Sequence, residues 1–257
     1  MELRDRVVVV TGASSGIGRR LALELATAGA IVVGFARRAD LLAVLQQELQ
    51  RTSPRSRTQV CDVTGTEAFI AALGEVATEH GRIDVLINNA GVGEPRADPL
   101  ALTDFRAVMD TNYFAAVAGT MAVLPDMQSR GCGVVVNVSS DSGRAPGPAD
   151  LAYGPTKAAL SAFTESMAMR VASTGVHLHI LYPGWVPTAM GSEAVDAGMP
   201  RPPRMVRRTE EQVAKLVLAR MGGRRVDIDA APVARLAPVA RALFPGLYRR
   251  GVERASR

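Results

Sequence analysis

The segment YGPTKAALSAF, residues 153–163, places an aromatic hydroxyl and an amine at a spacing that suits proton transfer. In an α-helix, Tyr153 and Lys157 would lie one turn apart on the same face. The intervening Pro155 fits if it lies in the first turn, where backbone N–H groups have no acceptor within the helix. A cation within roughly 4–6 Å favours the ionised form of a tyrosine, whose unperturbed pKa is about 10. We therefore expect Lys157 to lower the pKa of Tyr153 and to prepare it for proton exchange with an alcohol oxygen.

A second candidate site is the glycine-rich turn TGASSGIG, residues 11–18, which follows an apolar run and precedes a helical pattern. Gly12 permits a tight turn, Gly16 lets a pyrophosphate approach the backbone, and Gly18 allows close helix packing. The free N–H groups and the dipole of the following helix would attract the anion. An ordinary turn between a strand and a helix is the alternative, because three glycines alone are weak evidence.

These segments belong to a chain in which strand and helix patterns alternate. Short apolar, β-branched runs predict strands at 6–12, 31–36, 57–60, 83–91, 133–140 and 176–184. Amphipathic spacing predicts helices between them, including 18–30, 65–80, 104–130 and 155–174. This alternation predicts an α/β fold, a single doubly wound Rossmann domain whose parallel sheet of about seven strands has helices on both faces. We expect that domain at 1–230 and a basic, Pro/Arg-rich extension at 231–257.

Composition narrows the class of protein. The chain has 257 residues, 47% of them hydrophobic, and no run of 18 uncharged apolar residues that would predict a membrane span. The apolar stretch near the N-terminus is too short for a signal peptide, so we expect a cytoplasmic protein. Cys61 and Cys132 suit a reducing compartment, and neither they nor the alternating His177 and His179 form a metal-binding pattern.

The order of the motifs provides a more specific indication. TGASSGIG, NNAG at 88–91, Asn112, the serine of NVSS, Y-x-x-x-K and PGxVxT at 183–188 together resemble the short-chain dehydrogenase/reductase family. The resemblance runs from about residue 5 to residue 190. It implies a catalytic tetrad of Asn112, Ser140, Tyr153 and Lys157. Ser140 is chosen over Ser139 and Ser142 because it lies 13 residues before the tyrosine, the usual interval in the family.

The same resemblance implies binding of a nicotinamide dinucleotide. The expected contacts come from the glycine-rich turn, the ends of later strands, the catalytic pair and the PG segment. They are Gly12, Ser14, Ser15, Gly16, Ile17, Gly18, Arg37, Arg38, Asp62, Val63, Asn89, Ala90, Gly91, Tyr153, Lys157, Pro183, Gly184, Val186 and Thr188.

The end of the second strand bears on the choice of cofactor. Enzymes of this kind that use NAD carry an acidic residue there, whereas this chain has Ala36 followed by Arg37 and Arg38. Guanidinium groups suit a 2′-phosphate, so we expect NADP(H) rather than NAD(H). Ser15 departs from relatives that carry a basic residue at that position, and two solvated arginines are the alternative. Asp62 resembles the adenine-contacting aspartate of the family, or it caps the next helix.

We expect an NADP(H)-dependent oxidoreductase that interconverts a ketone or aldehyde and an alcohol, with Tyr153 as acid and base. Residues 185–208 would form a substrate lid, in which Trp185, Met190, Met199 and Met205 suggest a hydrophobic or lipid-like substrate or ordinary packing. A non-catalytic NADP-binding scaffold or redox sensor is the alternative function. Relatives are commonly homodimers or homotetramers, and no nucleic-acid partner is expected.

The C-terminal extension differs from that of many relatives. Residues 1–200 carry 16 basic and 20 acidic side chains, whereas residues 201–257 carry 14 basic and 5 acidic ones. The prolines at 232, 238 and 245 exclude one long helix from the segment RVDIDAAPVARLAPVARALFPGLYRR, residues 225–250. Its short apolar turns with interspersed arginines could contact an anionic membrane weakly and peripherally, or pack on a partner subunit or on the domain itself.

Overall fold

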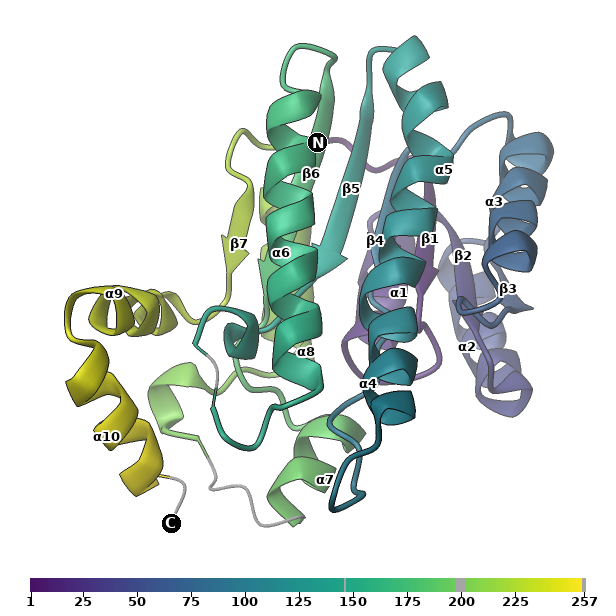
Figure 1. Cartoon of the computed structure of the whole chain (residues 1–257). Coiled ribbons are helices and arrows are strands. Elements are labelled where there is room, and N and C mark those ends of the chain that lie inside the picture. Colours follow the sequence, from purple (N-terminus) through teal and green to yellow (C-terminus); the bar gives the residue numbers. More distant parts are fainter. Residues whose placement is uncertain (146, 197–201, 256–257) are drawn as a thin grey trace.

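The computed structural model describes residues 1–145, 147–196 and 202–255 and is built around one parallel sheet (Figure 1). Its strands are β1 Val7–Thr11, β2 Ile31–Ala36, β3 Arg57–Val60, β4 Val85–Asn88, β5 Gly133–Val138, β6 Val176–Tyr182 and β7 Asp227–Asp229. The strand order is β3-β2-β1-β4-β5-β6-β7, and every neighbouring pair is parallel. The direction of winding reverses between β1 and β4, the point where open α/β sheets bind their ligands.

Helices cover both faces of the sheet, as Figure 1 shows. One face packs against α1 Gly16–Thr27, α2 Ala39–Thr52 and α8 Glu210–Arg220. The other packs against α3 Thr66–His80, α5 Ala115–Ser129 and α6 Tyr153–Arg170, with α4 Leu102–Met109 and the π-helical turn η1 Asp110–Phe114 leading into α5. The predicted doubly wound α/β fold with seven strands is therefore confirmed.

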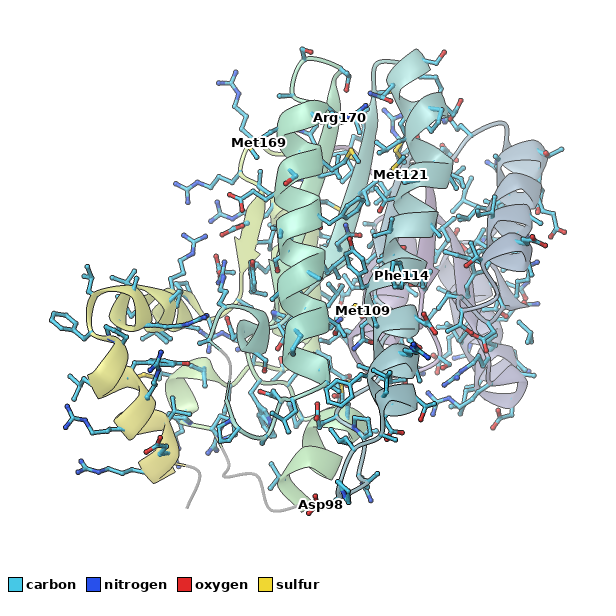
Figure 2. All side chains as sticks on the ribbon, in the orientation of Figure 1. Asp98, Met109, Phe114, Met121, Met169 and Arg170 are labelled. Atoms are coloured by element: carbon cyan, nitrogen blue, oxygen red, sulfur yellow. The ribbon has the colours of Figure 1, made fainter. Side chains whose placement is uncertain are left out.

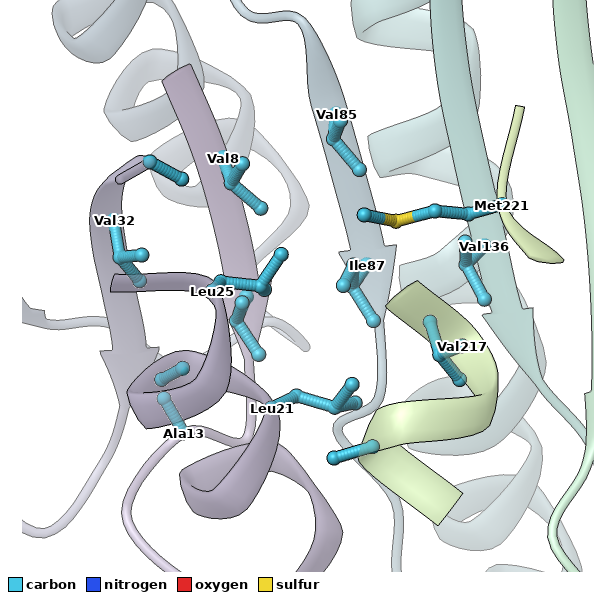
Figure 3. Packing of buried hydrophobic residues seen from close by; sticks show 14 of the residues in the cluster. Val8, Ala13, Leu21, Leu25, Val32, Val85, Ile87, Val136, Val217 and Met221 are labelled. Atoms are coloured by element: carbon cyan, nitrogen blue, oxygen red, sulfur yellow. The ribbon is translucent and has the colours of Figure 1, made fainter. Parts of the chain in front are cut away.

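The strand β1 shows why its sequence is an uninterrupted apolar run. Val8 and Val10 pack on the α1 side of the sheet, and Val7 and Val9 pack on the α3 side. All four are at most 2% exposed, since a parallel strand covered on both faces has no polar side. Figure 3 shows Val8 near Leu25 of α1, with Val217 of α8 closing the same layer. Burial of each such side chain stabilises the fold by about 1.5–3 kcal/mol.

Several predicted element ends differ from the structure. The strands expected at 83–91, 133–140 and 176–184 end at Asn88, Val138 and Tyr182, because the residues that follow leave the sheet to form loops at its carboxyl edge. The helix expected at 18–30 runs from Gly16 to Thr27, and the helix expected at 155–174 begins at Tyr153. That start places Pro155 in the first turn, as expected.

The helical run Leu102–Ser129 is longer than expected and contains the π-helical turn. Its length and a mean hydropathy of 1.2 are sufficient for a membrane span. However, the run lies along the sheet, and Val123, Leu124 and Met127 are buried in the core on that face. A helix that packs inside a globular domain meets the same criteria of length and composition, so we assign this one to the core.

The remaining elements lie at the carboxyl edge of the sheet or beyond β7. They are η2 Asp141–Gly143, α7 Ala189–Asp196, η3 Arg204–Val206, η4 Pro232–Arg235, α9 Leu236–Leu243 and α10 Pro245–Ala255. The extension thus forms two short helices with a break between Leu243 and Pro245, in agreement with the expectation from its prolines.

One buried polar side chain, His179 of β6, joins the sheet to the turn before β7. Its Nδ1 atom lies 2.9 Å from the carbonyl oxygen of Arg225, and its Nε2 atom accepts a hydrogen bond of 2.9 Å from the backbone of Gly222. A nitrogen that accepts a hydrogen bond cannot also carry a proton, so this geometry requires the neutral ring. Burial lowers the pKa of His179 below its usual value of 6.5.

This lowered pKa predicts a specific dependence of stability on pH. The unfolded chain takes up a proton at His179 near pH 6.5, and the folded chain resists it, so the free energy of unfolding falls as pH drops below that value. The contribution has a limit of about 1.4 kcal/mol per pH unit. Urea denaturation of the wild type and of His179→Gln, from about pH 7 to about pH 5, should give a shallower slope for the variant. Equal slopes would show that His179 does not control this loss.

Candidate active site

Ser140, Tyr153 and Lys157 meet at the carboxyl edge of the sheet. Ser140 follows β5, Tyr153 is the first residue of α6, and Lys157 lies one turn further along that helix. The Ser140 hydroxyl lies near that of Tyr153 and acts to lower the pKa of Tyr153. The Lys157 Nζ atom lies 5.7 Å from the centre of the Tyr153 ring and donates a hydrogen bond of 2.9 Å to the carbonyl oxygen of Val138. The i,i+4 spacing in the sequence therefore brings the phenol and the ammonium group together.

The three neighbouring serines have different partners. The Ser139 hydroxyl is buried, donates 3.0 Å to the carbonyl oxygen of Lys157 and lies 2.8 Å from the Ser161 hydroxyl, so it ties β5 to α6. The Ser142 side chain acts to lower the pKa of Asp150. Ser140 is the serine of the three that acts on the pKa of Tyr153, so the choice of Ser140 stays a prediction that is compatible with this arrangement.

Asn112 is buried in the π-helical turn, a feature that often occurs at functional sites. Its Oδ1 accepts 2.8 Å from the backbone of Val92, and its Nδ2 donates 2.9 Å to the carbonyl oxygen of Val92 and 3.2 Å to the Thr156 hydroxyl. A methyl group placed on Gly91 would lie 3.1 Å from Asn112 Oδ1 and 3.5 Å from Lys157 Nζ. The amide of Asn112 and the ammonium group of Lys157 therefore lie on the same side of Gly91.

The pKa values of this cluster differ from the expectation. Burial, together with the nearby carboxylates of Asp150 and Asp141, raises the pKa of Tyr153 to about 12, although the Ser140 hydroxyl opposes them. The prediction that Lys157 makes this phenol more acidic is therefore wrong. Burial also lowers the pKa of Lys157, to about 8. The phenol is thus protonated at neutral pH, and the amine is the more acidic of the two groups.

The glycine-rich turn has the geometry of an anion site. Gly12 and Gly16 adopt φ values of +66° and +57°, in the left-handed region that favours glycine. A methyl group on Gly18 would overlap the carbonyl oxygen of Gly12. The N-cap of α1 is Ser15, whose side chain does not cap the helix, so the first N–H groups remain available to an anion. Ser14 and Ile17 complete the turn, at least half buried.

The NNAG segment is attached to this turn through β1. The Thr11 hydroxyl accepts hydrogen bonds of 3.0 Å from the backbones of both Asn89 and Ala90. The Asn89 side chain donates 2.9 Å to the carbonyl oxygen of Thr11 and 3.3 Å to that of Gly12. Asn89 therefore holds the ends of β1 and β4 together at the point where the sheet reverses its winding.

Behind this segment lies a chain of buried amides that the sequence did not indicate. The Asn88 side chain donates 2.8 Å to Asn137 Oδ1 on β5, and the Asn137 side chain donates 2.9 Å to the Thr164 hydroxyl on α6. Asn88 also bonds the Thr120 hydroxyl on α5, at 3.2 Å. These bonds fix the strands that carry the site to the helices behind them.

Two exposed arginines lie beside the glycine-rich turn, immediately after β2. Arg38 Nη2 donates 3.0 Å to the Ser14 hydroxyl and 2.6 Å to the Ser15 hydroxyl. Arg37 is close enough to Asp62 to help lower the pKa of that carboxyl, whose main cause is a hydrogen bond from the backbone of Thr64. A carboxylate is absent from the end of β2 itself, where the last residue is Ala36.

Asp62 lies in a local turn rather than at a helix cap. Its Oδ1 accepts 3.0 Å from the backbone and 2.8 Å from the hydroxyl of Thr64. The N-cap of α3 is Gly65, which rules out the alternative that Asp62 caps this helix. The next residue, Val63, is buried in the core between the sheet and α3.

The PG segment follows β6 and passes over the glycine-rich turn. Pro183 and Val186 are buried. After Gly184, the backbone N–H of Trp185 donates a hydrogen bond of 2.9 Å to the carbonyl oxygen of Val206, and the Trp185 carbonyl oxygen accepts one of 2.8 Å from Arg208. A methyl group on Gly16 would lie 3.0 Å from the methyl of Thr188, so the two segments are in contact.

The segment that follows reaches the loop after β4. Met190 of α7 would lie 3.3 Å from a methyl on Gly93, so this helix covers the loop beside Gly91. Trp185 is half-buried, Met205 is 62% exposed, and Met199 lies outside the described residues. The expected lid therefore contacts the site at its α7 end.

Sequence reasoning missed Glu94, which holds the start of α6. Its carboxylate accepts 2.7 Å from the backbone N–H of Tyr153 and 2.9 Å from that of Ala152. A carboxylate at a helix N-terminus satisfies free donors and interacts favourably with the helix dipole. Because Glu94 lies 59 residues before Tyr153, no local pattern could reveal this contact.

A second missed group is an ion-pair network beyond Ser140. Arg144 pairs with Asp227 at 2.8 Å and with Asp229, and its guanidinium lies 3.1 Å above the centre of the Tyr182 ring. Arg235 of the C-terminal extension pairs with Asp229 from the other side. The network connects the loop after β5 to β7 and to the start of the extension.

Comparisons with known proteins agree with this geometry. The sequence model of the family described as short chain dehydrogenase matches residues 6–197. A relative from Danio rerio, "Dehydrogenase/reductase SDR family member 7B", is 35% identical over 260 residues, covering 96% of this chain and 84% of the relative.

Solved structures give the same result. A short-chain dehydrogenase from Streptomyces avermitilis has a TM-score of 0.80 and 27% identity, with 98% of each chain covered. A variant of the actinorhodin polyketide ketoreductase with NADPH has a TM-score of 0.77 and 28% identity over 84% of this chain and 89% of its own. A short chain dehydrogenase from Mycobacterium paratuberculosis bound to NAD is similar in fold, with a TM-score of 0.79 and 23% identity over 90% of this chain and 98% of its own.

The cap at α6 yields a stability prediction. Replacing Glu94 with alanine removes both acceptors, and we expect a loss of about 1 kcal/mol in the free energy of unfolding, within the range of about 0.5–2 for caps. Glu94→Gln keeps one acceptor and should lose roughly half as much. Denaturant unfolding measures both values.

The matched control is Glu67→Ala, which removes an exposed acidic residue from the first turn of α3. It should cost no more than about 0.5 kcal/mol. A Glu94→Ala protein as stable as the wild type would contradict the capping role.

Proposed function

The chain belongs to the short-chain dehydrogenase family, and from that premise we propose that it is an NADP(H)-dependent oxidoreductase interconverting a ketone or aldehyde and an alcohol. The observation that carries the proposal is the contact of Ser140 and Lys157 with Tyr153, next to a glycine-rich turn built for an anion. A non-catalytic scaffold has no use for a buried lysine, whose burial disfavours the charged form.

The chain's own residues fit a nicotinamide dinucleotide. The left-handed glycines and the free N–H groups at the start of α1 suit the pyrophosphate. The overlap of a methyl on Gly18 with Gly12 indicates a turn in which a larger residue cannot stand. When bound, this group supplies or accepts the hydride.

Protein side chains handle the proton. In the direction of reduction, the substrate oxygen accepts hydrogen bonds from the Ser140 and Tyr153 hydroxyls, and Tyr153 donates its proton as charge develops on that oxygen. With a pKa of about 12, Tyr153 is protonated at neutral pH and can donate a proton. The phenolate that this donation leaves must then take up a new proton. Lys157, with a pKa of about 8, is acidic enough to return a proton to it, and Asn112 lies on the same side of Gly91 as Lys157, where it can continue the path to water.

We propose NADP(H) as the preferred cofactor. Arg38 is held against Ser14 and Ser15 of the turn, and Arg37 directly precedes it in the chain. Two arginines therefore follow β2, whose last residue is not acidic. Guanidinium groups bind phosphate with charge-assisted hydrogen bonds. The solved ketoreductase with NADPH supports this choice, and the NAD-bound relative makes a direct comparison of the two cofactors necessary.

We propose a neutral, hydrophobic or lipid-like carbonyl compound as the substrate. The carboxylates of Asp141 and Asp150 act on Tyr153, and that of Glu94 acts on Asp150, so an anionic group near the reacting carbon would be repelled. Arg144 pairs with Asp141 at 3.7 Å, but it also pairs with Asp227 and Asp229, so one guanidinium is shared among three carboxylates and Asp150 is left without it. The apolar side chains of the lid segment support an apolar ligand.

We further propose a cytoplasmic protein that assembles as a homodimer or homotetramer and whose C-terminal extension contacts a membrane peripherally. Cys61 and Cys132 are both free thiols, which is compatible with a reducing compartment.

The proton-donor role predicts the effect of Tyr153→Phe. We expect kcat/KM for ketone reduction with NADPH to fall by at least about a hundredfold, the usual contribution of a positioned acid, while the Kd of NADPH changes little. Absorbance of NADPH measures the first quantity and fluorescence titration the second. Tyr113→Phe makes the same chemical change in the helix that carries Asn112 and should keep its activity. Turnover near that of the wild type in Tyr153→Phe would rule out the assignment.

The cofactor preference predicts the effect of replacing Arg37 and Arg38 with glutamine. Loss of charged hydrogen bonds to a 2′-phosphate should raise the KM for NADPH by roughly 10–100-fold, and the KM for NADH by much less. Arg51→Gln, at an exposed arginine in the last turn of α2, is the control. An unchanged ratio of the two KM values in the double variant would exclude the two arginines as the source of the preference.

A further inference from the structure

The two C-terminal helices expose an unusual amount of apolar surface. Leu236, Val239, Leu243, Phe244 and Leu247 are between 52% and 66% exposed. Such residues at intervals of three and four usually form the buried face of a surface helix. Contiguous apolar patches of this kind mark a binding surface. We call the surface formed by these five residues the tail face.

On α9, small side chains face the domain and large apolar side chains face outward. The residues that it turns toward the protein are Ala237 and Pro238, which are half-buried, whereas the larger Leu236, Val239 and Leu243 face outward. On α10, Tyr248 and Val252 are the partly buried residues. Hydrophobic burial within this chain therefore does not account for the large side chains of α9.

The two helices that carry the tail face are rich in arginine. Exposed Arg241, Arg249, Arg250 and Arg254 lie on the same two helices, with Glu253 as the acidic residue among residues 236–254. Figure 2 shows side chains tipped with nitrogen projecting from these helices away from the domain. Apolar side chains bordered by arginine are the pattern of a helix that lies in a membrane interface.

We propose that the tail face docks on an anionic lipid bilayer and that an apolar substrate reaches the active site from that membrane. A bilayer offers hydrocarbon for the leucines and phosphate for the arginines in one plane. A second copy of this chain is a poorer fit, because a two-fold contact through the same face would bring like-charged arginines together.

The second half of the proposal rests on the proposed function and on the position of the helices. In Figure 1, α9 and α10 lie at the carboxyl end of the sheet, on the same side as α7. Arg235, directly before α9, pairs with Asp229, and Asp229 pairs with Arg144 in the loop after Ser140. The membrane-facing surface is thus connected by ion pairs to the loop that positions the catalytic serine.

Flotation with lipid vesicles tests the docking. We expect the full-length protein to float with vesicles of phosphatidylcholine and phosphatidylglycerol and to remain behind with phosphatidylcholine alone. Binding should fall by at least about tenfold between about 0.1 M and about 1 M salt, because the arginine contribution is screened.

Variants separate the apolar and the charged contributions. The double variant Leu243→Glu and Phe244→Glu should bind vesicles at least about tenfold more weakly. The triple variant Arg249→Gln, Arg250→Gln and Arg254→Gln should show a loss of the same size. The matched control is Met169→Glu, because Met169 is 68% exposed but lies on α6 away from the tail (Figure 2). It should bind vesicles as the wild type does.

Two outcomes would overturn the docking proposal. One is vesicle binding that the variants do not change. The other is a wild-type protein that does not bind vesicles and forms a dimer that the Leu243 and Phe244 double variant loses, as measured by light scattering. The tail face would then be a subunit interface.

Activity assays separate this proposal from the proposed function. The double variant should reduce a water-soluble ketone as fast as the wild type does. With a long-chain ketone dissolved in the anionic vesicles, its rate should fall by at least about tenfold. Equal rates there would refute delivery from the membrane. Vesicle binding without reduction of any ketone would refute the function and leave the docking intact.

Discussion

The site depends on a lysine that the fold buries beside a tyrosine. Lys157 is 4% exposed, and its ammonium group bonds the carbonyl oxygen of Val138 at 2.9 Å. Burying a cation is costly, and the cost appears as a pKa lowered to about 8. The same burial raises the pKa of Tyr153 to about 12. The two shifts together reverse the usual order of acidity, which is the basis of the proposed return of a proton from the lysine to the tyrosine.

Several parts of the fold maintain this arrangement. Ser139 fixes the end of β5 to α6 at Lys157, and Glu94 fixes the start of α6 from the loop after β4. The π-helical turn places Asn112 beside Gly91, on the same side as the Lys157 ammonium group. The strand order that creates the switch point therefore also brings together the groups of the proposed proton path.

The sequence revealed those features that depend on residues close together in the chain. Tyr153 and Lys157 lie one helical turn apart, and Gly12, Gly16 and Gly18 occupy a single turn, so local spacing indicated both groups and the order of the motifs in the chain indicated their roles. The same holds for the seven-stranded fold, which follows from alternating patterns. The contact of Glu94 with α6 and the chain from Asn88 to Thr164 depend on the packing of distant elements. The pKa of Tyr153 was mistaken for the same reason, because burial is set by the whole fold rather than by the neighbouring lysine.

Charge divides the molecule into two regions with different chemical roles. Asp141 and Asp150 lie near the Tyr153 hydroxyl and Glu94 binds its backbone N–H, whereas the two helices of the tail face carry exposed arginines. An amphiphile with an anionic headgroup would be attracted to the arginines and repelled from the carboxylates. Its neutral, apolar part would therefore be the part that enters the site, where the hydroxyls of Ser140 and Tyr153 can hold a carbonyl oxygen. If both proposals hold, the charge distribution that would favour docking at a membrane would also select which end of such a substrate reacts.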